Sequence, residues 1–176
     1  RFVVPILSGH EGGANEWARQ ISDFLGAQCI ITGAQLYTQP LLTAGIGCNR
    51  GCPLDSLLAL LDETLESHGL RRHDVRALAS IELKQDELGL QQLAEMLQLP
   101  ISFYSATVLN EYGNRLSRKS EIVFRETGCY GVAEAAALVC AERLVSSSHR
   151  AELLIAKQKN ADATLAVARI YGNPAI

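Results

Sequence analysis

The strongest constraint on the fold is an alternation of strand-like and helix-like segments along most of the chain. Residues 41–47, "LLTAGIG", read as a buried strand. A helix follows, because apolar residues recur at helical spacing on one face, at Leu54, Leu57, Leu58, Leu61 and Leu65. Next come a strand over 75–83, a helix over 86–97 and a strand over 100–106. Such alternation is typical of a sheet covered by helices.

The last third of the chain extends the same pattern. Residues 120–128, "SEIVFRETG", are ambiguous, whereas the alanine-rich stretch 131–145 predicts a helix that packs closely on a sheet. Residues 151–170 contain two apolar stretches joined by a polar turn, which predicts a hairpin or a short crossover. We therefore expect the α/β class, as a three-layer α/β/α fold with a central mixed sheet of about five strands.

The first forty residues form a separate, smaller unit of the pattern. An apolar strand over 1–7 precedes a glycine-rich loop, and a second strand is expected over 29–32. Between them a helical face is formed by Ala14, Trp17, Ala18, Ile21, Phe24 and Leu25. Residues 33–40, "GAQLYTQP", have turn residues and no clear period. We therefore expect a small N-terminal strand-loop-helix-strand segment with a linker over 1–40, and a main domain over 41–176.

Composition excludes several function classes. The chain has 176 residues, of which 48% are hydrophobic and 20% charged, with a net charge of −3. A slightly acidic protein has no general attraction for polyanions, so we expect no nucleic-acid partner. Its most apolar stretch is interrupted by Glu134 and Glu142 and falls short of the roughly 18 uncharged residues of a membrane helix, so we expect no membrane association.

The cysteines indicate a reducing compartment. An odd number, five, are scattered over the chain, which suits free thiols better than a disulfide framework. We therefore predict a cytoplasmic location. Cys48 and Cys52 form an isolated C-x-x-x-C pair without the further ligands of a zinc site, and small buried thiols are the favoured interpretation.

Three glycine-containing or charged turns are candidate binding loops, because ligands of open α/β sheets bind beyond the strand ends. The first, "GIGCNRG", offers Gly45, Gly47 and Arg50 to an anion, although its G-x-G-x-x-x-G spacing departs from the dinucleotide fingerprint. A tight strand-to-helix turn explains the same glycines equally well.

The second candidate loop is "RETGCYG", with Glu126 and Gly128, where capping of the next helix by Glu126 and Thr127 is favoured over a place in the cleft. The third is "KQKNAD", with Lys157 and Lys159, for which a solvated turn is the simpler reading. If the three loops meet, their cations suit a ligand with several carboxylates.

A fourth loop, "SGHEGGAN", joins the first strand to the first helix. His10 is the strongest candidate for a general base because its unperturbed pKa lies near neutrality, and Glu11 is placed to orient it. The same stretch is also explained as a simple strand-to-helix connection.

Taken in order, four motifs resemble one family. "GIGCNRG", "LASIELKQDELGLQQLAEMLQLPISFYSA", "ETGCYGVAEAAAL" and "LLIAKQKNADATLAVAR" look like the C-terminal domain of the cobalamin-biosynthesis protein CbiG and its stand-alone relative CobE. Separately, "VVPILSGHEGGANEWARQISDFLGAQCIIT" looks like the end of the CbiG N-terminal domain. The resemblance covers about residues 41–170 and, more briefly, the segment before them.

The resemblance implies a role in corrin-ring construction. CbiG is the cobalt-precorrin-5A hydrolase, which opens a lactone on the ring periphery and releases acetaldehyde. CobE-like proteins imply an alternative, a non-catalytic module that binds or carries a corrinoid intermediate. Whether this chain is itself an enzyme stays open, since part of the CbiG N-terminal domain has no counterpart here.

The resemblance also implies the ligand and partners. The ligand would be a tetrapyrrole or corrinoid intermediate bearing many acetate and propionate groups, held at Gly45, Gly47, Arg50, Glu126, Gly128, Lys157 and Lys159. His10 and Glu11 would be the catalytic pair. We expect no cofactor and no metal site of the protein's own, since any cobalt would belong to the substrate. Other cobalamin-pathway enzymes are candidate partners, and the alanine-rich helix leaves a homodimer open.

Overall fold

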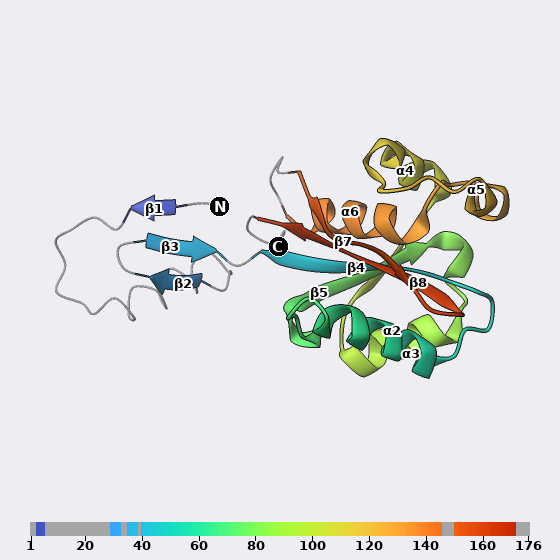
Figure 1. Ribbon diagram of the computed structural model, residues 1–176, viewed down its shortest axis with the longest axis horizontal. Helices are drawn as coiled ribbons and strands as arrows, with labels where there is room; N and C mark the ends of the chain where they lie inside the picture. Colours follow the sequence, from blue (N-terminus) through green and yellow to red (C-terminus); the bar gives the residue numbers. More distant parts are fainter. Residues whose placement is uncertain (1–2, 6–28, 33–34, 39, 146–149, 172–176) are drawn as a thin grey trace.

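The computed structural model describes residues 3–5, 29–32, 35–38, 40–145 and 150–171. Within these residues the strands form two separate sheets, one of three strands and one of five (Figure 1). The five-stranded sheet and its helices contain all the predicted binding loops of the main domain.

The main sheet is mixed, and β4 (Leu41–Cys48) is its central strand. The strand order is β6-β5-β4-β8-β7, with β5 at Val75–Ile81, β6 at Ile101–Tyr104, β7 at Glu152–Lys159 and β8 at Ala163–Ile170. Strands β4, β5 and β6 are parallel, whereas β8 is antiparallel to both β4 and β7. The prediction of a mixed five-stranded sheet is confirmed, and the C-terminal segment is a hairpin.

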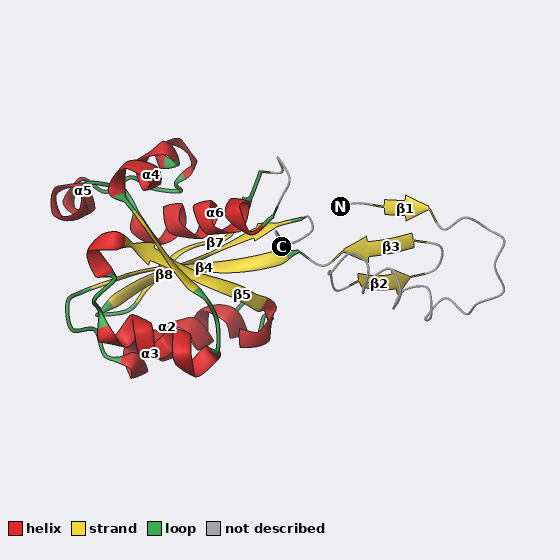
Figure 2. Cartoon of the chain, turned by 180° about the vertical axis from the view of Figure 1, so that it is seen from behind, coloured by secondary structure: helices red, strands yellow, loops and turns green. Residues whose placement is uncertain are grey.

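Helices cover both faces of this sheet, which confirms the predicted α/β/α layers (Figure 2). One face is covered by α2 (Leu54–Glu66) and α3 (Leu88–Leu97). The other is covered by α6 (Val132–Leu144), with the short helices α4 (Ala106–Glu111) and α5 (Glu121–Thr127) outside it. Single 3₁₀ turns lie at Arg72–Asp74, Glu82–Lys84 and Gly113–Arg115.

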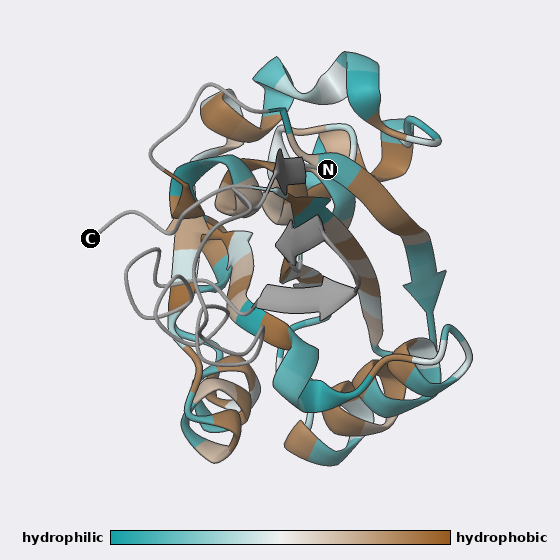
Figure 3. Ribbon diagram, turned by 90° about the vertical axis from the view of Figure 1, so that its left-hand side faces the viewer, coloured by the Kyte–Doolittle hydropathy of each residue, from teal (hydrophilic) through white to brown (hydrophobic). Residues whose placement is uncertain are grey.

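The predicted apolar face of α2 is the face that packs on the sheet. Leu57, Leu61 and Leu65 are buried, and they contact the core formed by β4, β5 and α3. Burying one such leucine side chain stabilises the fold by about 1.5–3 kcal/mol. Pro53 precedes the helix, as predicted, and Gly69 follows it with a φ of 68°. Both hydrophobic and hydrophilic residues occur along the helices that cover the sheet, as expected for helices with one buried face (Figure 3).

On the opposite face, α6 approaches β4 so closely that only glycine fits between them. A Cβ atom on Gly45 would lie 2.0 Å from the carbonyl oxygen of Ala133. Beside it, the Thr43 hydroxyl donates a hydrogen bond of 2.8 Å to the carbonyl of Ala137. The alanines of α6 are therefore small for the predicted reason, close packing of a helix on a sheet.

The small sheet contains one strand that the sequence pattern did not predict. Strands β1 (Val3–Pro5) and β2 (Cys29–Thr32) fall within predicted strands, and both pair with β3 (Gln35–Thr38) in the order β1-β3-β2. The sequence pattern predicts a linker over 33–40, because this segment has no clear hydrophobic period. Four residues are too few to show alternation, so β3 is visible only through its partners. The predicted helix over 14–25 lies outside the described residues.

Several predicted boundaries in the main domain need correction. The strand predicted over 75–83 ends at Ile81 and continues as a 3₁₀ turn, and the helix predicted from Asp86 begins at Leu88. The ambiguous segment 120–128 is helical over most of its length, as α5.

Among the described residues Cys48, Cys52, Cys129 and Cys140 are free thiols. No helix in the described part of the chain has the length and hydropathy needed to cross a bilayer.

Candidate functional site

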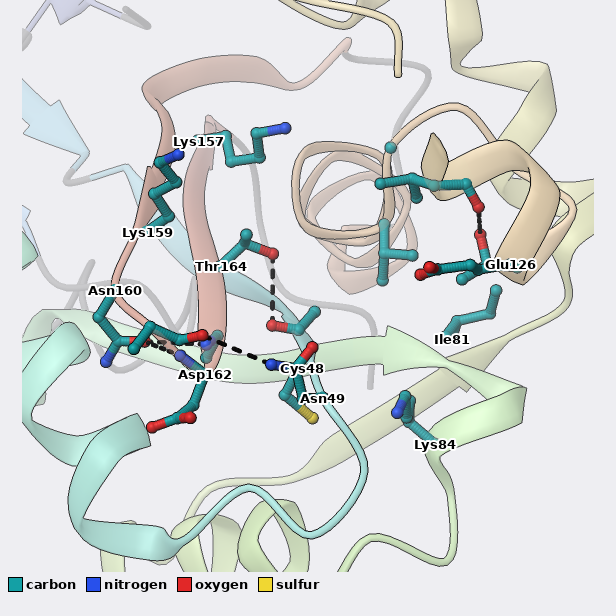
Figure 4. A pocket seen from close by; sticks show the side chains of 17 residues that line it. Cys48, Asn49, Ile81, Lys84, Glu126, Lys157, Lys159, Asn160, Asp162 and Thr164 are labelled. Atoms are coloured by element: carbon teal, nitrogen blue, oxygen red, sulfur yellow. Dashed lines mark hydrogen bonds between the residues drawn. The ribbon is translucent and has the colours of Figure 1, made fainter. Parts of the chain in front are cut away.

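A pocket of about 200 Å³ lies at the carboxyl ends of β4 and β5 (Figure 4). Its walls come from the loop after β4, the end of β5, the turn between β7 and β8, and the α5–α6 connection. The lining residues are Gly47, Cys48, Asn49, Ile81, Lys84, Val123, Glu126, Thr127, Gly131, Val132, Lys157, Lys159, Asn160, Ala161, Asp162, Ala163 and Thr164. The position follows from topology, because parallel strands place their carboxyl ends at one edge of a sheet, where ligands bind.

The β7–β8 turn is fixed to the start of α2 by a polar network. Asp162 accepts a 2.8 Å hydrogen bond from the Ser56 hydroxyl, and the Asn160 amide donates to the Ser56 carbonyl at 2.8 Å. The Asn160 side-chain oxygen accepts from the backbone N–H groups of Asp162 and Ala163. Because these bonds join residues far apart in the sequence, the turn forms a fixed wall of the pocket.

The two predicted lysines of this hairpin both line the pocket. Lys157 and Lys159 are two residues apart on β7, whose pairing with β8 shifts register between Ile155 and Gln158, and both line the pocket (Figure 4). Lys157 is half-buried and Lys159 is exposed. Neither ammonium group forms an ion pair with a described residue. Their role in binding stays a prediction, and their placement agrees with it.

A buried carboxylate on α6 positions Lys157. Glu134 is 3% exposed, and its Oε1 accepts a 2.9 Å hydrogen bond from the backbone N–H of Lys157. The same carboxylate accepts from both the N–H and the hydroxyl of Ser117, at 2.7 and 2.5 Å. Glu134 thus joins α6 and β7 to the loop before α5. Sequence reasoning noted it only as a charge in an apolar stretch.

The α5–α6 connection is arranged differently from the predicted capping motif. Glu126 is exposed and lines the pocket, and Gly131 is the residue that precedes α6. The Thr127 hydroxyl donates to the Val123 carbonyl at 2.7 Å, within α5. Capping of α6 by Glu126 and Thr127 is therefore wrong. Gly128 ends α5 with a φ of 77° and is not among the residues that line the pocket.

Two other predicted binding residues also lie outside the pocket. Gly45 is buried mid-strand against α6, so it is a packing position, while Gly47 lines the pocket two residues later. Arg50 is exposed and turned to the next loop, where it donates to Asp86 at 2.5 Å, to Glu87 at 3.2 Å and to the Leu83 carbonyl at 2.7 Å. This contact holds the pKa of Asp86 below its usual range. Asp86 lies before α3 in the sequence, and its carboxylate pairs with Arg50.

A lysine that sequence reasoning did not select, Lys84, lines the pocket from the 3₁₀ turn after β5. It is 8% exposed, which is rare for lysine, and its nearest carboxylate is Glu87. A signal was present in the sequence, since "IELKQDE" puts a cation directly after a buried strand. It was missed because a charged turn is usually solvated.

The thiols near the pocket are not activated. Burial raises the pKa of the Cys48 thiol to about 11 and also raises that of Cys52. A thiol of this kind is protonated at neutral pH and is a poor nucleophile.

No group of three or more His, Cys, Asp or Glu able to hold a metal ion occurs in the described part of the chain. His68 and His73 are exposed, and His10 and Glu11 lie outside the described residues.

Comparison with protein families gives a match over most of the chain. The family model described as "Cobalamin synthesis G C-terminus" matches residues 42–168, and "Cobalamin synthesis G N-terminal" matches residues 1–35. The chain belongs to the cobalamin synthesis G C-terminus family. The resemblance to CbiG and CobE inferred from the four motifs is therefore confirmed.

Relatives of two kinds match within this family. Protein CobE of Sinorhizobium sp is 39% identical over 127 residues, which cover 72% of this chain and 79% of the relative. The cobalt-precorrin-5A hydrolase of Priestia megaterium is 34% identical over 143 residues, or 81% of this chain. The matched region spans only 36% of that hydrolase.

Solved structures of the family share the fold. The crystal structure of a CobE protein is 50% identical, with a TM-score of 0.70 over 75% of this chain and 92% of that one. The cobalamin biosynthesis protein chiG of Agrobacterium tumefaciens is 26% identical, with a TM-score of 0.55 over 73% of this chain and 97% of that one. The predicted fold class is therefore confirmed by the family as well as by the strand order.

Proposed function

We propose that the main domain binds a polycarboxylated corrinoid precursor of cobalamin in the pocket at the ends of β4 and β5. The observation that carries the proposal is the charge of the lining: three lysines, Lys84, Lys157 and Lys159, against two carboxylates, Glu126 and Asp162. Asp162 already accepts a hydrogen bond from Ser56, so it is partly compensated within the fold. Cations on fixed backbone suit a ligand that presents several carboxylates.

The size of the pocket determines which part of such a ligand it holds. Its volume of about 200 Å³ lies below the roughly 300–1,000 Å³ typical of pockets that enclose a whole small molecule. A tetrapyrrole ring would therefore rest across the mouth with one or two peripheral acid groups inside. Binding by the periphery orients the ring and leaves its edge accessible to catalytic groups.

The reaction we propose for the complete protein is the hydrolysis of cobalt-precorrin-5A, which is the activity in the names of three relatives. The family resemblance implies that this reaction opens a ring lactone and releases acetaldehyde. This needs a base to activate water and a donor for the developing oxyanion. His10, oriented by Glu11, stays our proposed base. The contribution of the main domain is to bind and orient the substrate through Lys157, Lys159 and the loop after Gly47.

A non-catalytic role is the second candidate. The matched region spans most of the CobE relative but about a third of the Priestia megaterium hydrolase, so this domain also suits a module that holds a corrinoid intermediate. In both cases we propose that the protein supplies no cofactor, any cobalt being part of the substrate. Contact with other pathway enzymes, a homodimer and a cytoplasmic location stay predictions.

Binding and turnover separate these functions. The chain is titrated with cobalt-precorrin-5A, following the absorption of the ring, and acetaldehyde is measured in the same samples. We expect binding, and a loss of about 10- to 100-fold in affinity when Lys157 and Lys159 are both changed to Met, as for lost charge-assisted contacts. Lys119→Met is the matched control, because Lys119 is an exposed lysine away from the pocket.

The outcomes distinguish the two candidates. Acetaldehyde release that disappears in His10→Ala supports the hydrolase, and unchanged turnover in that variant refutes the proposed base. Tight binding without acetaldehyde, in this chain and in one extended upstream of Arg1, supports the carrier. Equal affinity in the double lysine variant and the Lys119→Met control would contradict the proposed site.

A further inference from the structure

The side chain of Lys84 is a buried cation with few partners. It is 11% exposed and lies in the pocket wall, near the half-buried thiol of Cys48. An ammonium group has three hydrogen-bond donors and no acceptor. In the described part of the chain, Asn110 Oδ1 is the one fully buried side-chain polar atom without a hydrogen-bond partner. The Lys84 Nζ is therefore accessible from the pocket, where its donors take acceptors from water or from a ligand.

The carboxylate closest to Lys84 is already occupied. Glu87 is 5% exposed, and its Oε1 is 3.8 Å from the Lys84 ammonium, which is beyond hydrogen-bond distance. Its Oε2 accepts from the backbone N–H of Gly51 at 2.9 Å, and its Oε1 accepts from Arg50 at 3.2 Å. Glu87 therefore gives Lys84 a Coulombic partner but no hydrogen bond.

The other neighbouring groups do not supply an acceptor charge. Asp86 is exposed, and its carboxylate accepts from Arg50. The Asp162 carboxylate accepts from the Ser56 hydroxyl. The Cys48 thiol, with a pKa of about 11, carries no charge at neutral pH. Among the described residues, no group accepts a hydrogen bond from the Lys84 ammonium.

We propose that Lys84 binds a carboxylate substituent of the ligand inside the pocket and selects it over the neutral amide or ester. The inference rests on the proposed function and deepens it, because it assigns one acid group of the ligand to one side chain. Lys157 and Lys159 stand on the hairpin side of the same pocket and are left for the acid groups nearer its mouth (Figure 4). A compact ammonium recognises charge, so an uncharged substituent at this place leaves the donors unpaired.

The first test compares variants with the octacarboxylate uroporphyrin as the probe, followed by its fluorescence. We expect Lys84→Met to weaken binding by about 10- to 100-fold, the loss typical of a buried charge-assisted hydrogen bond. Lys84→Arg keeps the charge and is expected to retain more affinity than Lys84→Met. The control Lys119→Met removes the same net charge outside the pocket and is expected to change affinity less than about threefold.

The second test observes the NMR signal of the Lys84 ammonium group directly and does not need a tetrapyrrole. In ¹⁵N-lysine NMR of the whole chain, the Lys84 ammonium signal is identified by its absence in Lys84→Arg. Tricarballylate, a small tricarboxylate, is then added. We expect it to shift this signal, and the succinamide control to leave it in place.

The results separate the two proposals. If uroporphyrin binds the wild type and Lys84→Met equally, the Lys84 inference is wrong and the proposed function stands. If uroporphyrin binds none of the proteins but tricarballylate shifts the Lys84 signal, the carboxylate site stands and the tetrapyrrole function fails. A Lys84 signal that tricarballylate leaves unchanged overturns the inference, even if Lys84→Met does not fold.

Discussion

Two carboxylates in this fold, Glu142 and Glu87, show how a charge cluster between packed elements differs from one beside a pocket. Glu142 accepts from the Tyr112 hydroxyl at 2.6 Å, from Arg115 at 2.7 Å and from the backbone N–H of Ala151 at 3.0 Å. Arg115 also donates to the Ala151 carbonyl and lies over the Tyr112 ring. Every charged group of this cluster has hydrogen-bond partners within the fold.

The Glu87 cluster has the same ingredients but leaves one of them incomplete. Glu87 accepts from Arg50 and Gly51, while Lys84 has only a Coulombic contact with it at 3.8 Å. The Glu142 cluster fastens α6 to the segment before β7, whereas the Glu87 cluster lies beside a pocket. The difference is that the Glu142 cluster is complete within the fold, whereas the Lys84 ammonium lies at the pocket with its donors open to water or a ligand.

The largest expected effect comes from breaking the complete cluster. Arg115→Met removes the bonds to Glu142 and to the Ala151 carbonyl and leaves a half-buried carboxylate with fewer donors. We expect a loss of about 2–3 kcal/mol in the free energy of unfolding, measured by urea denaturation. Glu152→Gln, which breaks an exposed pair with Arg169, is the control and is expected to cost less than about 1 kcal/mol. Equal losses would contradict the distinction between the clusters.

The second prediction concerns the pH dependence of stability. Tyr112 in the Glu142 cluster and Cys48 near Lys84 change the free energy of unfolding in the same direction. Burial raises the pKa of Tyr112 from 10.0 to about 12 and that of Cys48 from 9.0 to about 11. The folded state then holds these protons more tightly than the unfolded state, so stability is full below the ordinary pKa values and falls as pH rises through about 9 to 12. Urea denaturation across this range measures the loss.

Substitutions assign the alkaline loss to its groups. Burial also raises the pKa of Tyr104 to about 12 and that of Cys140 to about 11. Tyr112→Phe is therefore expected to reduce the loss between about pH 10 and 12, and Cys48→Ser the loss between about pH 9 and 11, without abolishing either. Glu142 affects the free energy of unfolding at acidic pH. Burial opposes the shift, but bonds from Tyr112 and Arg115 keep its pKa below the usual value, so its contribution is lost as pH falls through that lowered pKa. An alkaline profile that neither substitution changes would rule out these two groups.

The smallest expected effect on stability comes from Lys84→Met, in the Glu87 cluster. Lys84→Met removes a buried cation that has no hydrogen-bond acceptor among the described residues, so we expect a change of less than about 1 kcal/mol in unfolding free energy, of either sign. Arg50→Met, at the exposed side of the same cluster, is the matched control and is also expected to cost less than about 1 kcal/mol. A loss as large as that of Arg115→Met would show that Lys84 is mainly structural.

Much of the main domain was predictable from local patterns. The leucines of α2 recur at helical spacing on one buried face, and such a pattern depends only on local geometry and the exclusion of water. Helix α6 is buried on all sides from Val132 to Ala141, and its alanine content predicted it. The site was predicted in part: Gly47, Glu126, Lys157 and Lys159 line one pocket, while Gly45, Arg50 and Gly128 do not. The pattern of glycines alone does not tell a packing glycine from one that faces a ligand.

By itself, the sequence determined the α/β class, most of the helices and strands, and the family, since each depends on periodicity or on motifs read along the chain. Only the tertiary structure decided that Arg50 is paired with Asp86 and Glu87, and that Lys84 is buried without a hydrogen-bond acceptor among the described residues. The physical reason is that pairing and burial depend on which loops meet in space, and strand order, not sequence distance, brings those loops together.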